Sequence, residues 1–237
     1  MFSRTAQYYD LIYAHQGKDY GAEVERLRAI IAQEPPTGRR TLLDVACGTG
    51  GHIAYLKAHY QVSGLDLEPG LLEVARERHP DVPFYQGDMA DFDLGRQFDV
   101  ITCLFSAIGY VRTLDKLGQA IAAMARHLEP GGLLLVEPWF TPGDWHPGKT
   151  HALLIEEPEL KIARLSTSSS DGRLSWFDFH YLIATPEGTE HRVERHELGL
   201  FERSEMRAAF VDAGLEDVRY DEFGLTGRGL WIGRREQ

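Results

Sequence analysis

Three acidic residues in the first ninety positions have the types and spacing to bind a nucleoside. Asp44, Asp66 and Asp88 each follow a short apolar stretch, and the segment Ala46–Gly50 (Ala-Cys-Gly-Thr-Gly) begins two positions after the first of them. Glycines let a ligand approach the backbone closely, and the N–H groups of a helix that starts there face the ligand. Because ligands of open α/β sheets lie at the carboxyl ends of the strands, we expect these residues to share one pocket.

Each acid has its own expected partner. Asp66 can accept hydrogen bonds from both hydroxyls of a ribose, and Asp88 can accept one from an adenine amino group while Met89 packs on the ring. Asp44 precedes the glycines, where the ammonium-bearing end of a ligand favours a carboxylate. Together the three acids predict a site for S-adenosylmethionine (SAM), which carries an adenosine, an ammonium group and a sulfonium.

The alternative ligand is a dinucleotide such as NAD. Counted from Gly48, the sixth position of a G-x-G-x-x-G pattern is Ile53 rather than glycine. A glycine turn alone is weak evidence for either ligand. Acids at the ends of three successive strands favour SAM.

The hydrophobic pattern indicates which elements must position these residues. Apolar stretches predict strands at Thr41–Ala46, Gln61–Asp66, Val82–Gln86, Phe98–Phe105 and Leu133–Val136. Helices are expected over Gly21–Gln33, through Ile53 to Lys57, from Pro69, and over Leu114–Leu128. Buried strands that alternate with helices predict an α/β fold with a doubly wound parallel sheet.

The pattern changes from about residue 150. Three long alternating stretches predict an antiparallel β insert, which we place at residues 151–200 of a single domain spanning residues 1–237; the strands are expected at Lys161–Thr167, Leu174–Ala184 and Thr189–Leu200. Ser204–Ala213 is expected to be a helix with a serine cap. Val218–Tyr220 and Gly229–Ile232 would be the last two strands of the main sheet.

Composition narrows the class of protein and its partners. The chain has 237 residues, of which 43% are hydrophobic, and a formal net charge of -11, which argues against nucleic acid or an anionic membrane as its main partner. The first ten residues lack the apolar core of a signal peptide and no run reaches the ~18 apolar residues of a membrane span, so we expect a cytoplasmic protein. Cys47 and Cys103 lack metal-site spacing, and no metal is expected.

Longer motifs narrow the interpretation further. The chain resembles the class I SAM methyltransferases and, within them, the bacterial N,N-dimethyltransferases of nucleotide-linked aminosugars of the desosamine and mycaminose type. The motifs that carry this resemblance are Gly17–Tyr20, Leu43–Gly50, Gln86–Met89, Phe105–Ser106 with Gly109–Tyr110, Leu128–Gly132, Glu137–Trp139 and Gly227–Leu230. The resemblance implies a seven-stranded sheet of order 3-2-1-4-5-7-6 with an antiparallel insert, a homodimer, and two methylations of an amine on a dTDP-deoxysugar. The chain departs from the family at Phe140, at residues 141–151 and in much of the insert, where sugar contacts are expected.

The resemblance also assigns roles to residues beyond the acids. Tyr110 would lie near the amine as a positioning group or hydrogen-bond acceptor, and Glu137 would meet the amine or a sugar hydroxyl. Trp139 would offer a flat wall, Arg228 would pair with a pyrophosphate, and Ser106 would contact the substrate. Each has an alternative: packing for Tyr110 and Trp139, a solvated strand end for Glu137, and a surface ion pair for Arg228.

The expected SAM site is wider than the three acids. Tyr9 and Tyr20 would cover the methionyl end, although packing of an N-terminal aromatic cap is an alternative for each. The full expected set is Tyr9, Tyr20, Asp44, Ala46, Cys47, Gly48, Gly50, Asp66, Leu67, Asp88, Met89 and Leu104.

Two other functions stay open on these observations. The acids and the glycine turn suit an O- or C-methyltransferase of another small metabolite equally well. They also suit a protein that binds SAM without turnover. The residues do not specify the sugar, the position of its amine, or the number of methyl groups added.

Overall fold

The computed structural model describes residues 5–34 and 38–237; the first four residues of the segment tested above for a signal peptide lie outside this part. Its helical elements are η1 (Ala6–Tyr8), α1 (Tyr9–His15), α2 (Tyr20–Ala32), α3 (Ile53–Leu56), α4 (Pro69–Arg78), η2 (Ala107–Val111), α5 (Leu114–Arg126) and α6 (Arg203–Asp212). Its strands are β1 (Thr41–Val45), β2 (Gln61–Asp66), β3 (Phe84–Gln86), β4 (Phe98–Cys103), β5 (Leu128–Val136), β6 (Thr150–Glu157), β7 (Leu160–Asp171), β8 (Leu174–Thr185), β9 (Gly188–Gly199), β10 (Leu215–Asp221) and β11 (Leu230–Arg235).

Seven strands form the main sheet, in the order β10-β11-β5-β4-β1-β2-β3. Strands β3, β2, β1, β4 and β5 are parallel, whereas β11 runs antiparallel to both β5 and β10. With β10 as the sixth and β11 as the seventh strand of this sheet, the order is 3-2-1-4-5-7-6, and the predicted fold class is confirmed. The parallel strands therefore bring the ends of β1, β2 and β3 to one edge of the sheet.

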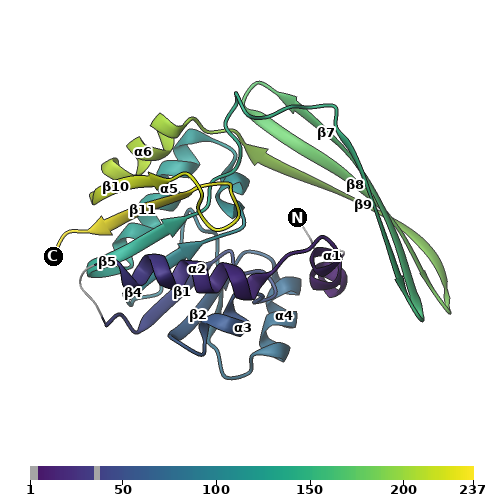
Figure 1. Cartoon of the computed structure of the whole chain (residues 1–237), viewed down its shortest axis with the longest axis horizontal. Coiled ribbons are helices and arrows are strands. Elements are labelled where there is room, and N and C mark those ends of the chain that lie inside the picture. Colours follow the sequence, from purple (N-terminus) through teal and green to yellow (C-terminus); the bar gives the residue numbers. More distant parts are fainter. Residues whose placement is uncertain (1–4, 35–37) are drawn as a thin grey trace.

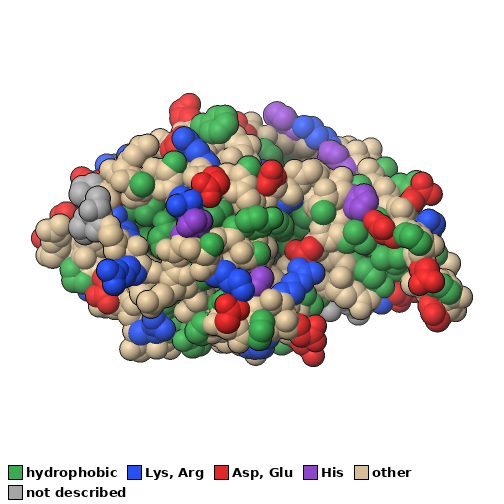
Figure 2. Space-filling view, turned by 60° about the horizontal axis from the view of Figure 1, so that its bottom comes forward, with side chains coloured by type: hydrophobic (Ala, Val, Ile, Leu, Met, Phe, Trp, Pro, Cys, Tyr) green, Lys and Arg blue, Asp and Glu red, His purple; other side chains and the backbone are tan. Residues whose placement is uncertain are grey.

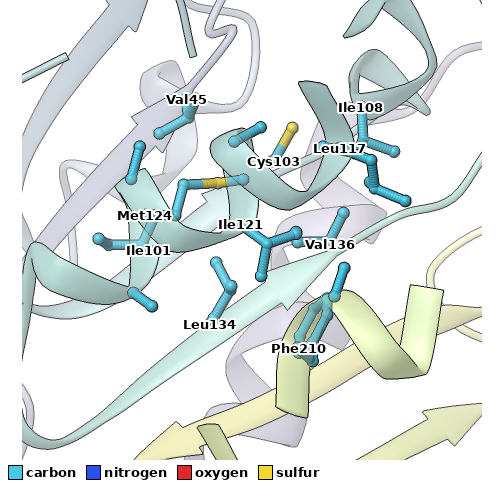
Figure 3. Close-up of a cluster of buried hydrophobic side chains, with 14 of the residues drawn as sticks. Val45, Ile101, Cys103, Ile108, Leu117, Ile121, Met124, Leu134, Val136 and Phe210 are labelled. Carbon is cyan, nitrogen blue, oxygen red and sulfur yellow. The ribbon is translucent and has the colours of Figure 1, made fainter. Parts of the chain in front are cut away.

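Apolar side chains fill both faces of this sheet. On one face, Ile121 and Met124 of α5 pack with Ile101 of β4, Leu134 of β5 and Phe210 of α6, and all five are almost wholly buried (Figure 3). On the other face, α2 contributes the core residues Val24, Leu27, Ile30 and Ile31. Helices on both faces hold the strand ends in fixed positions.

A second sheet of four antiparallel strands, in the order β6-β7-β8-β9, is inserted between β5 and α6. Figure 1 shows these long strands reaching beyond the main sheet and past α1. The sequence predicted three of the strands and missed β6, which pairs with β7 from Thr150–Thr167 to Glu157–Leu160. Only Ala152–Ile155 is an apolar run within β6, too short a signal on its own.

The expected serine cap of α6 is wrong. The helix starts at Arg203, and Glu202 and Glu205 form a reciprocal capping box instead. The carboxyl of Glu205 accepts a hydrogen bond from the Glu202 N–H at 2.8 Å, which satisfies a donor at the helix start. Within residues 5–34 and 38–237, no helix combines the length and apolar character that a membrane crossing requires.

Candidate active site

A cavity of about 920 Å³ lies between the carboxyl ends of the parallel strands and the second sheet. Figure 2 shows hydrophobic side chains gathered in a hollow across the middle of the view, with basic, acidic and histidine side chains around it. One wall comes from the segments that follow β1 to β5, and the other from side chains of the second sheet. The volume is at the upper end of the range for small-molecule sites, about 300–1,000 Å³, so the cavity has room for a large ligand.

The turn after β1 forms the floor of the cavity. Ala46 and Gly48 line it and have φ angles of 58° and 57°, in the left-handed region that glycine adopts without strain. A Cβ on Gly48 would have no neighbour within 4 Å, so the space above its backbone is open to a ligand. The backbone N–H of Gly48 donates to Asp66 Oδ2 at 2.8 Å, which joins the turn to the end of β2.

Asp66 is held in place by backbone donors. Its Oδ1 accepts from the Glu68 N–H at 2.9 Å while Oδ2 accepts from Gly48, so each oxygen keeps further lone pairs for a ligand. Burial raises the pKa of Asp66, and the N–H groups of Glu68 and Gly48 oppose that rise. The carboxyl lines the cavity, and its geometry fits a ribose whose two hydroxyls donate to one carboxylate.

The other expected residues on this wall follow β2, β3 and β4. Asp88 lines the cavity, and its Oδ1 accepts from the Ala90 N–H at 2.9 Å. Leu67, Met89 and Leu104 line it as well and supply the apolar surface that an adenine ring requires. The structure thus brings the ribose and adenine parts of the predicted SAM site together, although their contacts with SAM stay predictions.

Four of the expected SAM residues do not line the cavity. Asp44 is 2% exposed, and its Oδ1 accepts from Thr102 Oγ1 of β4 at 2.8 Å. Burial is the main reason that the pKa of Asp44 is raised. The other three lie behind the turn: Cys47 is buried in the core on the α2 face, Gly50 approaches His79, and Tyr20 packs on Gly51 and His52.

Aromatic side chains from α1 form another part of the cavity wall. Tyr9 and Tyr13 line it, with their ring centroids 4.7 Å apart, and Tyr13 packs edge-on against Phe105. Burial raises the pKa of both phenols, so they stay uncharged. Aromatic faces attract a cationic sulfonium. Tyr13 was not among the expected residues, although it follows Tyr9 at helical spacing.

The segment after β4 has an unusual backbone. Phe105 and Ser106 both have positive φ angles, 54° and 58°, which cost free energy in non-glycine residues. The fully buried carboxyl of Glu137 holds this segment, because it accepts from the Phe105 N–H at 2.6 Å and from Thr226 Oγ1 at 3.0 Å. Glu137 does not line the cavity, and its expected contact with the amine stays a prediction.

Arg228 lines the cavity next to the segment that follows β4. Its Nη1 donates to Ser106 Oγ at 3.1 Å, and its guanidinium carbon lies 5.4 Å from the ring centroid of Trp139 and 6.0 Å from that of Phe105. Trp139 lines the cavity too, and its Nε1 donates to Ser175 of β8 at 3.0 Å. Ser106 is 1% exposed and orients Arg228 rather than lining the cavity.

The second sheet supplies a wall where the sequence predicted sugar contacts without naming the residues. Its inner face, which we define as the cavity-lining side chains of β7, β8 and β9, consists of Arg164, Ser166, Ser168, Phe177, Phe179, His196 and Leu198, with Arg195 and Glu197 at its edge. Arg164 is 5% exposed, and its Nη1 has no hydrogen-bond partner within the part of the chain that the structure describes. The alternation of side chains along the strands could have indicated these positions, but not which face they occupy.

Charged side chains of both signs line the cavity. The acids Asp66, Glu68 and Asp88 follow β2 and β3. Other segments supply the acids Asp144 and Glu197 and the basic residues Arg112, Lys116, Lys149, Arg164, Arg195 and Arg228. The cavity therefore offers carboxylates to hydroxyls or a positive charge and guanidinium groups to an anion, even though the whole chain is acidic.

The sheet order, the glycine turn and the acids after β2 and β3 define a class I SAM-dependent methyltransferase. A model of the methyltransferase domain matches residues 42–132, which contain these features. Closer relatives narrow the family. The chain is 40% identical to the dTDP-3-amino-3,4,6-trideoxy-α-D-glucopyranose N,N-dimethyltransferase of Streptomyces venezuelae, over 96% of both chains. It is equally identical to the dTDP-4-amino-2,3,4,6-tetradeoxy-D-glucose N,N-dimethyltransferase of Saccharopolyspora spinosa, over 97% of this chain and 92% of that protein.

A solved structure agrees with these sequence matches. The SAM-bound structure of CalS10, an amino pentose methyltransferase from Micromonospora echinaspora involved in calicheamicin biosynthesis, superposes with a TM-score of 0.86. The two chains are 38% identical, and the match covers 96% of each. The chain belongs to the family of these aminosugar N-methyltransferases, and its methyl donor is SAM. The predicted family, enzyme class and cofactor are thereby confirmed.

Proposed function

We propose that this enzyme methylates the amino group of a nucleotide-linked deoxyaminosugar, with dTDP as the nucleotide. The observation that carries the proposal is Arg228, a guanidinium that lines the same cavity as Asp66 and is flanked by aromatic rings. A guanidinium can bind a pyrophosphate with two parallel hydrogen bonds. The relatives act on dTDP-linked aminosugars, which carry such a pyrophosphate.

When bound, SAM supplies a methyl group that leaves the sulfonium as the new N–C bond forms, so that the sulfonium becomes a neutral thioether and the methylated ammonium then releases a proton to solvent. Asp66 and Asp88 hold the adenosine, and Tyr9 covers the methionyl end. Tyr110 orients the amine, and Arg228 fixes the nucleotide. Holding two reactants in line can contribute up to about 7–11 kcal/mol to catalysis, so no covalent nucleophile is needed.

The decisive experiment offers the purified protein methyl-labelled SAM and a panel of dTDP-aminosugars that differ in the position of the amine. Mass spectrometry should find label on nitrogen together with S-adenosylhomocysteine. A matched sugar with a hydroxyl in place of the amine is the control. Methyl transfer only to oxygen or carbon would reject the proposal in favour of another methyltransferase. SAM binding without S-adenosylhomocysteine would indicate a protein without turnover.

We also propose that the enzyme is a cytoplasmic homodimer whose subunits meet through the second sheet. The outer face of that sheet exposes Leu154, Leu165, Leu182 and Val193 at 63%, 59%, 52% and 41%. Their register places them as neighbours, because Leu165 pairs with His180, which pairs with Val193. Light scattering should give twice the mass of the chain, and Leu182→Glu should give a monomer. Val211→Glu, on the exposed side of α6, should stay dimeric.

A further inference from the structure

At the wall of the cavity, polar side chains from η2 and β9 contact one another in series. Tyr110 Oη lies 2.8 Å from His196 Nδ1, and His196 Nε2 lies 3.7 Å from Glu194 Oε2. Glu194 Oε2 also accepts from Thr5 Oγ1 at 2.8 Å. His196 is 1% and Glu194 5% exposed, so packing holds both in place. Tyr110 and His196 both line the cavity.

These contacts decide where the protons lie. A carboxyl that faces Nε2 favours the imidazole tautomer with its proton on Nε2, and Nδ1 is then an acceptor. Burial lowers the pKa of His196, so the ring is neutral above its ordinary titration range. Burial also raises the pKa of Tyr110, which keeps its proton. The single proton of Tyr110 is therefore donated to His196, and its oxygen presents only lone pairs to a ligand.

The groups around His196 maintain this state. Arg164 of β7 lies close enough to lower the pKa of the imidazole further, while Glu194 on the same strand opposes it. Tyr181 of β8 is buried beside Arg164, and the ring of Phe179 lies edge-on to the imidazole at 5.1 Å. A positive neighbour and an apolar ring both disfavour a second proton on His196.

We propose that His196 and Glu194 are positioning residues that hold Tyr110 as a pure hydrogen-bond acceptor for the N–H groups of the substrate amine. The inference rests on the proposed function and assigns His196 and Glu194 a role in it. An amine that donates N–H to Tyr110 keeps its lone pair free for the methyl group. A hydroxyl that donated to the amine would instead occupy that lone pair. A monomethylated amine retains one N–H, so the same contact serves a second methylation.

Two substitutions of His196 distinguish its positioning of Tyr110 from a packing role and from removal of a proton from the substrate amine. His196→Asn can offer its amide oxygen to Tyr110 but cannot take a proton, whereas His196→Phe offers no acceptor. We expect kcat to fall about a hundredfold in His196→Phe, because the amine is no longer aligned, and by about threefold at most in His196→Asn. The KM for SAM should not change in either variant. His59→Phe, an exposed histidine that follows α3, is the matched control.

The pH dependence of kcat is a further test, because a purely structural role of His196 would not affect it. Below the pKa of His196 its Nδ1 would donate, and the Tyr110 proton would turn toward the cavity. The wild type should therefore lose kcat as the pH falls through that pKa, and His196→Asn should lack this limb. Protonation of the amine itself affects both proteins equally. Equal losses in the Phe and Asn variants at every pH would overturn the proposal, as would a wild-type rate in His196→Phe.

Binding without SAM tests the acceptor independently of turnover. Calorimetry compares dTDP-3-amino-3,4,6-trideoxyglucose with an analogue that has hydrogen in place of the amine, at a pH where the amine is neutral. The wild type and His196→Asn should prefer the amine by about threefold to tenfold, the value of one net hydrogen bond. His196→Phe should show no preference. If the wild type binds the amine with this preference but transfers no methyl group, the proposed function fails while the acceptor role stands.

Discussion

The two walls of the cavity are built by different means. On the wall from the main sheet, backbone N–H groups hold Asp66, and parallel strands fix the positions of the residues around it. On the wall from the second sheet, side chains orient other side chains, as His196 does for Tyr110 and Ser175 for Trp139. Backbone contacts survive changes in most neighbouring side chains, whereas side-chain contacts depend on each partner. The first wall therefore suits a constant cofactor, and the second suits a substrate that varies among relatives.

The largest expected effect tests the first wall. Asp66→Ala removes the acceptor for the ribose and leaves the Gly48 N–H without its partner, so SAM affinity should fall about a hundredfold or more. Isothermal titration with SAM and S-adenosylhomocysteine measures this. Glu73→Ala, on the exposed side of α4, should bind both ligands normally. An affinity within a few fold of the wild type would show that Asp66 is not the ribose acceptor.

A smaller effect is expected at Arg228, the proposed partner of the pyrophosphate. Arg228→Ala should raise the KM for the dTDP-aminosugar about tenfold to a hundredfold, because a charged hydrogen-bond donor to the pyrophosphate is lost. SAM affinity should stay unchanged, because Arg228 is proposed to bind only the nucleotide of the second substrate. Steady-state kinetics with each substrate varied in turn checks both statements, with exposed Arg207→Ala as the control. A parallel loss of SAM affinity would show that Arg228 also contributes to SAM binding.

Arg164 offers a sharper test of the second wall. Arg164→Met should weaken binding of the dTDP-aminosugar about tenfold, because a buried guanidinium that faces the cavity is removed. Its melting temperature should not fall, since replacing a buried charge by an apolar side chain of similar volume is often neutral or stabilising. Titration calorimetry and thermal melts measure the two effects. A large drop in melting temperature with unchanged binding would make Arg164 a structural residue.

The smallest effect concerns stability and pH. Because burial raises the pKa of Asp44, its ionised form destabilises the folded state at neutral pH. Asp44→Asn should therefore raise the melting temperature at pH 7.5, and this gain should shrink as the pH falls through the raised pKa and vanish near the ordinary value of 3.8. Thermal melts across this pH range test the sign. A gain that persists at low pH would point to a cause other than ionisation.

The difference between the two walls also explains which parts of the site could be predicted from the sequence. The pattern of a short apolar stretch that ends in an acid predicted the bounds of β2 correctly. The predicted residues Asp66, Asp88 and Met89 line the cavity. Asp44 lies behind the turn because it precedes the end of β1 and faces Thr102, a direction that the sequence pattern does not specify. The sheet order came from resemblance rather than from hydrophobic periodicity.

The second sheet was harder to predict because its site depends on register. Arg164, Phe179 and His196 lie on three strands and become neighbours only through pairings such as Phe179–Glu194 and Arg164–Tyr181. A shift of one residue would turn each of these side chains to the other face. Alternation predicts that two faces exist, but the strand contacts decide which of them meets the cavity.

The two-faced character of β7 to β9 has a practical consequence for altering the choice of sugar. Along β7 and β8, where successive side chains point to opposite faces, only every second position reaches the cavity. A directed-evolution library confined to Ser166, Ser168 and Phe177 would sample new acceptor molecules without disturbing the methyl-donor half or the outer leucines. Randomising their immediate neighbours would instead alter the outer face of the sheet.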